Sequence, residues 1–144
     1  MVSFDYSRLI VSGKNEHDFV QERLAKDPAY EKSWSDLKAS FETNVVAGVG
    51  YEWPPGAQPG PAGPGAHLTV FPTALTMGKY MFVAATATRV DADLNFTVNG
   101  QPADQIRGSG AQVPTITTPS VYQHMPAVAD AIGRRAGRYV RSKN

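Results

Sequence analysis

Proline and glycine occupy nine of the twelve residues from Pro54 to Gly65. Each proline fixes its own φ angle and disfavours helix in the residue before it, while each glycine adds conformational freedom. A segment of this kind excludes both a helix and a regular strand. The irregular glycine spacing also excludes a collagen repeat. We therefore predict a long extended arm over residues 47–66, between a helical half of the chain and a β half.

The first 46 residues are predicted to be helical. Asn15 is a suitable N-cap for a first helix, because acidic residues follow it in the first turn. Asp27-Pro28 marks a second helix start, with proline where a missing N–H costs nothing. Large apolar residues then recur at spacings of four, three and four: Tyr30, Trp34, Leu37 and Phe41. This period predicts a helix over residues 28–43 whose aromatic face lies in the core.

The β half is predicted to be a meander over residues 67–107. Its first strand, "HLTVF", is short and is expected to end at Pro72. Residues 75–90 are apolar on both faces, which is typical of a strand that is covered on both sides. We therefore expect residues 75–90 to form a central strand of the sheet.

A tight hairpin is predicted at Asn99-Gly100. Residues 91–98 alternate between polar and apolar side chains, and both turn residues tolerate the positive φ angles of a type I′ turn. The return strand, "QPADQIRG", has weak strand propensity, and its Pro102 indicates the edge of a sheet. The meander is thus predicted to be antiparallel, with an exposed edge.

The C-terminal region is predicted to contain an extended segment followed by a basic helix. Residues 108–125 carry no charge and include several Pro, Gly and Thr residues, which favours an extended crossing. A helix is expected from Pro126 to about Val140, within a basic tail that ends at residue 144. Gly133 and Gly137 each cost about 1 kcal/mol of helix propensity, so this helix requires a packing surface. The order of elements predicts a single α+β domain with segregated helices and strands.

Two segments have no charged residue: Trp53–Gly78 and Gly108–Ala129. Disordered linkers are usually rich in charge, whereas these segments contain Pro, Gly, Thr, Ala and aromatic residues. Such a composition favours contact with another surface. We interpret the Pro/Gly stretch as an assembly arm that lies on a neighbouring chain, with prolines that lower the entropy cost of ordering it.

No motif in the chain defines a catalytic, cofactor or metal site. Cysteine is absent, and the three histidines lie too far apart in the sequence for metal-ligand spacing. "HLTV" at His67 resembles the His-x-Thr-hydrophobic tetrapeptide of the two-histidine phosphoesterases. That mechanism needs two such histidines, and neither His17 nor His124 repeats the motif. We expect no catalytic residue, no cofactor and no metal ligand, and therefore a protein that is not an enzyme.

Four arginines and one lysine lie in the last eleven residues. Three interpretations of this basic tail stay open. The side chains can contact nucleic-acid phosphates, pair with acidic residues of a neighbouring subunit, or form the solvated end of a helix, where the dipole favours cations. The formal net charge of +1 does not steer the whole molecule toward nucleic acid.

The order of helices, meander and basic helix in a chain of 144 residues resembles that of tailed-bacteriophage neck proteins, the head–tail connector and tail-completion proteins. The resemblance is architectural and covers most of the chain. It implies a structural virion protein, assembled in the host cytoplasm, that forms a homo-oligomeric ring and contacts other virion proteins, with DNA nearby. No membrane contact is expected, because no apolar run approaches the roughly 20 residues of a spanning helix.

Under this prediction the partner-binding residues lie in the arm and in the basic helix. They are Trp53, Pro54, Pro55, Pro59, Pro61, Pro64, Arg134, Arg135, Arg138 and Arg141. Two alternatives remain open. One is a small enzyme or ligand-binding domain with a pocket roofed by the loop and lined by Tyr51, Trp53 and His67. The other is a nucleic-acid-binding accessory protein that uses the C-terminal helix.

Overall fold

The computed structural model describes residues 1–53, 55–61, 65–81, 84–115, 118 and 120–143. Its elements follow one another along the chain as β1 (Val2–Phe4), β2 (Ile10–Val11), β3 (Lys14–Asn15), α1 (Glu16–Leu24), α2 (Tyr30–Glu52), β4 (Ala66–Thr76), β5 (Lys79–Met81), β6 (Ala84–Thr86), β7 (Thr88–Val98), β8 (Gln101–Gln112) and α3 (Val121–Ser142).

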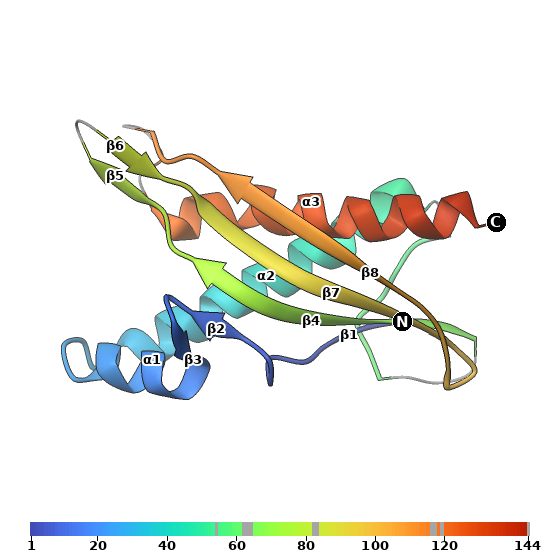
Figure 1. Ribbon diagram of the computed structural model, residues 1–144, viewed down its shortest axis with the longest axis horizontal. Coiled ribbons are helices and arrows are strands. Elements are labelled where there is room, and N and C mark those ends of the chain that lie inside the picture. The colour runs from blue at the N-terminus through green and yellow to red at the C-terminus, as the bar shows by residue number, and fades with distance from the viewer. Residues whose placement is uncertain (54, 62–64, 82–83, 116–117, 119, 144) are drawn as a thin grey trace.

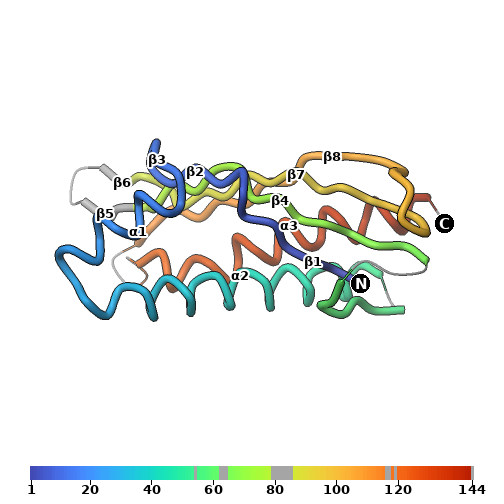
Figure 2. The backbone as a smooth tube through the Cα atoms, turned by 90° about the horizontal axis from the view of Figure 1, so that it is seen from below, coloured from blue at the N-terminus to red at the C-terminus, as the bar shows by residue number. Residues whose placement is uncertain are grey.

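The fold is α+β, as predicted, and has two layers (Figures 1 and 2). One layer is a six-stranded sheet in the order β3-β2-β4-β7-β8, with β1 also paired to β4. The long helices α2 and α3 lie side by side against one face of this sheet (Figure 2). The sheet is mixed rather than purely antiparallel, because β1 and β2 run parallel to β4. The first 46 residues therefore contribute three short strands as well as helices.

The two N-terminal helices are confirmed, and the second is longer than predicted. Asn15 caps α1 by accepting a hydrogen bond from the Asp18 backbone N–H at 2.8 Å. Helix α2 continues to Glu52, so residues 47–52 of the predicted arm are helical. Gly48 explains the extension: a Cβ on it would lie 2.6 Å from the Asp130 backbone oxygen, so α2 and α3 are in backbone contact there.

The predicted single strand over residues 75–90 is wrong. Strand β4 does not end at Pro72 but passes through it to Thr76, with a register shift against β7 between Pro72 and Ala74. Such an irregularity tolerates a residue that has no N–H to donate. The chain then forms the small β5–β6 hairpin, and β7 begins at Thr88. The apolar pattern alone therefore gave no sign of the chain reversal between β5 and β6.

The hairpin turn at Asn99-Gly100 is confirmed, with φ angles of 51° and 79°. Its return strand is stronger than predicted: β8 has 12 residues, and Pro102 lies in this edge strand as expected. β8 includes residues 108–112 of the predicted extended segment.

Helix α3 begins five residues before Pro126, at Val121. The start is set by Ser120, whose side chain accepts from the Tyr122 N–H, and by Gln123, whose side chain accepts from the Ser120 N–H. The predicted need for a packing surface is confirmed. A Cβ on Gly133 would lie 2.1 Å from the Val45 backbone oxygen of α2, so glycine permits the close approach of the two helices.

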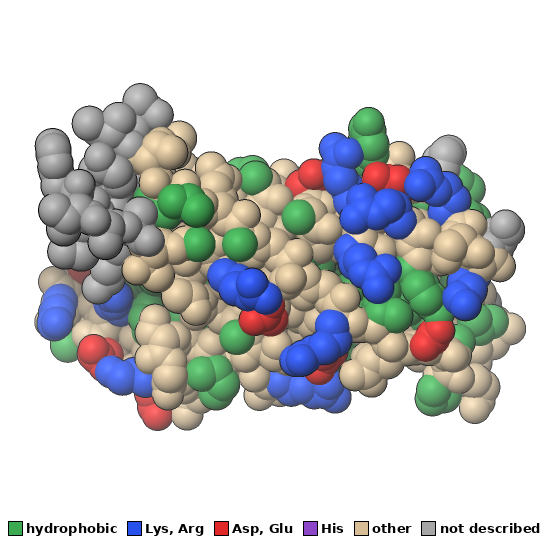
Figure 3. All heavy atoms as spheres, turned by 45° about the horizontal axis from the view of Figure 1, so that its top comes forward, with side chains coloured by type: hydrophobic (Ala, Val, Ile, Leu, Met, Phe, Trp, Pro, Cys, Tyr) green, Lys and Arg blue, Asp and Glu red, His purple; other side chains and the backbone are tan. Residues whose placement is uncertain are grey.

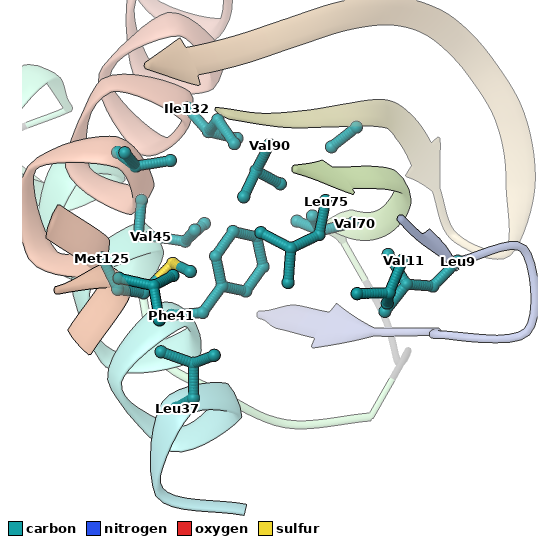
Figure 4. Packing of buried hydrophobic residues seen from close by; sticks show 14 of the residues in the cluster. Leu9, Val11, Leu37, Phe41, Val45, Val70, Leu75, Val90, Met125 and Ile132 are labelled. Carbon is teal, nitrogen blue, oxygen red and sulfur yellow. The ribbon is translucent and has the colours of Figure 1, made fainter. Parts of the chain in front are cut away.

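The core lies between the two layers (Figure 4). Leu37, Phe41 and Val45 on α2 and Ile132 on α3 point toward Val70 and Val90 of the sheet (Figure 4). The aromatic face predicted on α2 is thus confirmed as core, because Trp34 and Phe41 are only 6% and 4% exposed.

Candidate interaction surface

Strand β8 forms one edge of the sheet, and within the described part of the chain it pairs only with β7. Its hairpin end is interrupted by Pro102 and by a register shift opposite Phe96 and Thr97. The other end, Gly108–Gln112, carries neither charge nor proline. An edge of this kind offers unpaired backbone N–H and C=O groups to an added strand.

The inner face of β8 lies directly on α3. A Cβ on Gly110 would be 2.2 Å from the Val128 backbone oxygen, and one on Gly108 would be 3.5 Å from the Ile132 side chain. Both positions are buried, whereas their neighbours in the strand, Arg107 and Ser109, are exposed. Helix α3 therefore packs against the inner face of β8, and no described strand pairs with its outer edge.

A cleft of about 400 Å³ lies where β8 crosses α3. We call it the arginine cleft; its lining residues are Arg107, Gly108, Ser109, Asp130, Ala131, Arg134, Arg135 and Arg138. Lys and Arg side chains gather on the side of the molecule that carries the C-terminal half of α3 (Figure 3). The cleft thus joins the free strand edge to a basic helix surface.

Three arginines of the basic tail make ion pairs inside the chain. Arg134 binds Asp130 at 2.6 Å, and this contact raises the pKa of Arg134. Arg138 and Arg141 both bind Glu52, at 3.3 and 3.1 Å. Glu52 is the last residue of α2, so the tail holds the ends of the two long helices together. None of the three open interpretations of the tail included these ion pairs with carboxylates of the same chain.

Arg135 and Arg107 differ from that group. Arg135 is exposed, and none of the ion pairs within the described chain includes it. Arg107 is 77% exposed and shares Asp93 with Arg8, at 3.3 and 3.7 Å. These two arginines therefore carry charge that the protein's own carboxylates do not fully neutralise.

The Pro/Gly loop is held by its own domain at three places. The Val2 N–H donates to the Gln58 oxygen at 2.8 Å, and the Gly60 N–H donates to the Val2 oxygen at 3.0 Å. At the end of the loop the Gly65 N–H donates to the Asn99 side chain at 2.6 Å. Pro59 bridges to Val2 but is exposed, as are Pro55 and Pro61, and Pro54 and Pro64 lie outside the described residues.

Parts of the two charge-free segments are buried by their own domain, and our interpretation that other chains bury them is wrong for these parts. β4 supplies Leu68, Val70 and Leu75 to the core, and the start of α3 supplies Met125 and Val128. Charge is absent from these segments because they form the central strand and the inner face of a packed helix.

Trp53 and His67 line a groove of about 520 Å³, as one alternative predicted, together with apolar residues that include Phe96 and Tyr139. Tyr51 is not part of it; the residue is 68% exposed, and the centroid of its ring lies 3.7 Å from the Arg134 guanidinium carbon. His67 is 4% exposed and its Nε2 lies 2.8 Å from Ser3 Oγ. Its buried Nδ1 has no partner in the described chain, so no third group orients the ring as a base.

Sequence reasoning missed a buried hydrogen-bond chain around His124, because nothing in the sequence links its members. The Gly78 N–H donates to Thr88 Oγ1 at 2.8 Å, and that oxygen lies 2.7 Å from His124 Nδ1. His124 Nε2 lies 2.6 Å from the Thr118 carbonyl, which can only accept, so Nε2 carries the proton and Thr88 donates to Nδ1. This chain of hydrogen bonds holds the start of α3 against the sheet, and both ring nitrogens of His124 have a partner.

Among the described residues no three His, Asp or Glu side chains lie close enough to hold a metal ion. None of the helices in the described ranges is long and apolar enough to cross a membrane. No protein-family model matches the chain, and no curated protein matches it.

Proposed function

We propose that the protein is a non-catalytic assembly module that joins another protein chain by accepting a strand at the free edge of β8. The observation that carries the proposal is the 12-residue edge strand, whose described neighbours on the sheet lie on one side only. Five consecutive residues of this edge, Gly108–Gln112, have none of the charges or prolines that usually prevent strand addition.

Strand addition supplies affinity through backbone hydrogen bonds and specificity through alternate side chains. β8 is supported by α3 and cannot move inward, since Gly110 is already in contact with the Val128 backbone. A pre-ordered edge of this kind costs little entropy when a partner strand binds. If a second copy of this chain supplied the added strand, the product would be the homo-oligomer predicted from the neck-protein resemblance. The virion role stays a prediction.

The test is amide hydrogen exchange on the full chain, with and without a ten-residue peptide of alternating Thr and Val. We expect added protection in β8 and none in β1 or β2. Because the chain has no cysteine, Ser109→Cys places a single thiol on the edge for a bulky maleimide, which should abolish that protection. The same label at Ser7→Cys, in the exposed turn before β2, is the control. Protection that survives the label at Ser109→Cys would contradict the proposal.

A second candidate function is ligand binding in the Trp53 groove. It is favoured by the groove volume of about 520 Å³ and its aromatic lining. An apolar fluorescent dye that binds there should quench or shift Trp53 emission, and Tyr139→Ala should weaken its binding. Unchanged Trp53 emission at saturating dye would exclude this candidate.

A further inference from the structure

We infer that the strand accepted by β8 is an extended acidic segment of a different protein, which lies in the arginine cleft. The inference rests on the proposed function and names the chemistry of its partner. It depends on three features: the excess of arginine around the cleft, the presence of arginine on both faces of the incoming strand, and the location of the chain's own acidic residues.

Arginine exceeds carboxylate around the cleft. Its lining contains four arginines (Arg107, Arg134, Arg135 and Arg138) but one carboxylate, Asp130, which is already paired with Arg134. The carboxylates that pair with the other arginines of the lining are each shared with an arginine outside it: Asp93 binds Arg107 and Arg8, and Glu52 binds Arg138 and Arg141.

Arginine lies on both sides of the position that an added strand would take. Side chains alternate along β8, so Gly108 and Gly110 face α3 while Arg107 and Ser109 face away from it. Outward side chains of an added strand would therefore pass Arg107. Inward side chains would lie above α3, where Ala131 leaves room and Arg135 is exposed. Carboxylates at either register would find a guanidinium partner.

The same charges disfavour a second copy of this chain. Pairing two β8 edges would bring two arginine clefts together and leave their like charges unpaired. The chain's own acid-rich region does not offer an extended strand either, because Glu16, Asp18, Glu31 and Asp36 belong to helices α1 and α2. The acidic segment must therefore come from another protein.

The test measures binding of fluorescein-labelled ten-residue peptides to the full chain. The probe alternates Glu and Val; the comparisons alternate Lys and Val, alternate Thr and Val, or repeat the Glu probe with an N-methylated backbone. We expect the Glu probe to bind at least about tenfold more tightly than each comparison, with added protection of β8 amides. A ten-nucleotide single-stranded oligothymidine, which has charge but no strand backbone, should also bind at least about tenfold more weakly.

Arg135→Glu is the decisive variant, because Arg135 is exposed and its loss breaks no ion pair of the described chain. Reversing its charge should weaken the Glu probe about tenfold. Lys26→Glu changes the net charge equally on an exposed residue after α1 and should alter binding less than about twofold.

The outcomes separate the inference from the proposed function. Equal binding of the Glu and Thr probes, with no effect of Arg135→Glu, would contradict the inference that the partner segment is acidic. The proposal of strand addition to β8 would remain. Equal binding of the N-methylated probe would overturn both. Tighter binding of oligothymidine than of the Glu probe would show that the partner is a nucleic acid and not an acidic protein. A concentration-dependent dimer that Arg135→Glu does not weaken would show that the partner is a second copy of this chain.

Discussion

The two edges of the sheet differ in the length of their strands and in whether another segment of the chain pairs with them. At one edge the strands β1, β2 and β3 have three residues or fewer, and the segment Gln58–Gly60 bridges to Val2 on both its N–H and its carbonyl. At the other edge β8 runs for 12 residues, and no described segment pairs with its outer side. Natural proteins shorten or cover edges to prevent unwanted strand pairing. The uncovered edge is therefore the one available to a partner.

This difference also explains the Pro/Gly loop. A proline-rich segment cannot continue a ladder, so it ends the sheet wherever it is placed. Here it lies along β1, where the Pro59 bridge to Val2 closes the edge. The loop covers an edge of its own domain at the residues that the structure describes.

The largest effect is expected from Gly110→Val, which tests whether α3 supports the free edge. A Cβ at this position would lie 2.2 Å from the Val128 backbone oxygen, so β8 must move. We expect a loss of about 3 kcal/mol in the free energy of unfolding and a decrease of about 6–12 °C in Tm. Ala111→Val, one residue further on the exposed face, should change Tm by less than about 2 °C. Equal Tm values for the two variants would show that β8 does not rest on α3.

Val2→Ala tests the covered edge. Val2 is 3% exposed beneath its bridge to the loop, and truncation removes two methyl groups and leaves a cavity. The free energy of unfolding should fall by about 2 kcal/mol in a urea titration. Val98→Ala removes the same atoms from a residue that is 48% exposed beside the hairpin and should cost less than about 0.5 kcal/mol. Similar costs would mean that the loop does not hold β1 in a packed edge.

A smaller, pH-dependent effect is expected from His67, which joins β1 to β4 through Ser3. Burial lowers the pKa of His67 below 6.5, and the N-terminal ammonium lowers it further. Because the unfolded chain binds this proton more readily, the neutral ring stabilises the fold fully above about pH 6.5, and that stability is lost as the pH falls below it. Unfolding free energies at pH 7.5 and 5 should therefore differ less in His67→Gln than in the wild type. His17→Gln, on the exposed face of α1, should behave like the wild type.

The smallest effect is expected from Glu52→Gln, which removes the carboxylate shared by Arg138 and Arg141. We expect a loss of about 0.5 kcal/mol that disappears in 1 M salt, because both arginines are about half exposed. The variant should also bind the Glu–Val peptide a few-fold more tightly, since Arg138 of the cleft and its neighbour Arg141 lose their internal partner. Weaker peptide binding would contradict the charge argument.

Much of the fold could be predicted because its signals are local. The aromatic period from Tyr30 to Phe41 predicts α2, and Asn99-Gly100 predicts the hairpin. The extension of α2 through Gly48 could not be predicted, because the favourable term is contact with α3, a segment more than 80 residues away in the sequence. For the same reason the length of β8 could not be predicted. Its glycines lower strand propensity but permit the close approach of α3.

One feature of the candidate surface, the position of Pro102 at a sheet edge, was predicted correctly. The assignment of Arg134, Arg135, Arg138 and Arg141 to partner binding stays a prediction. Which arginines are internally paired depends on Glu52 and Asp93, and no local pattern connects these carboxylates to the tail. The assignment of Trp53 and the prolines to partner binding stays a prediction.

The most direct test of the central claim is residue-resolved amide hydrogen exchange on the free chain at low concentration. We predict that the amides of Val2 and Gly60, and all amides in the middle of β7, are protected. In β8, from Asp104 to Gln112, alternate amides should exchange at nearly the rate of an unstructured peptide, because they face the open edge. Protection of every β8 amide to the level of β7 would show that this edge is already covered, and the account would be wrong.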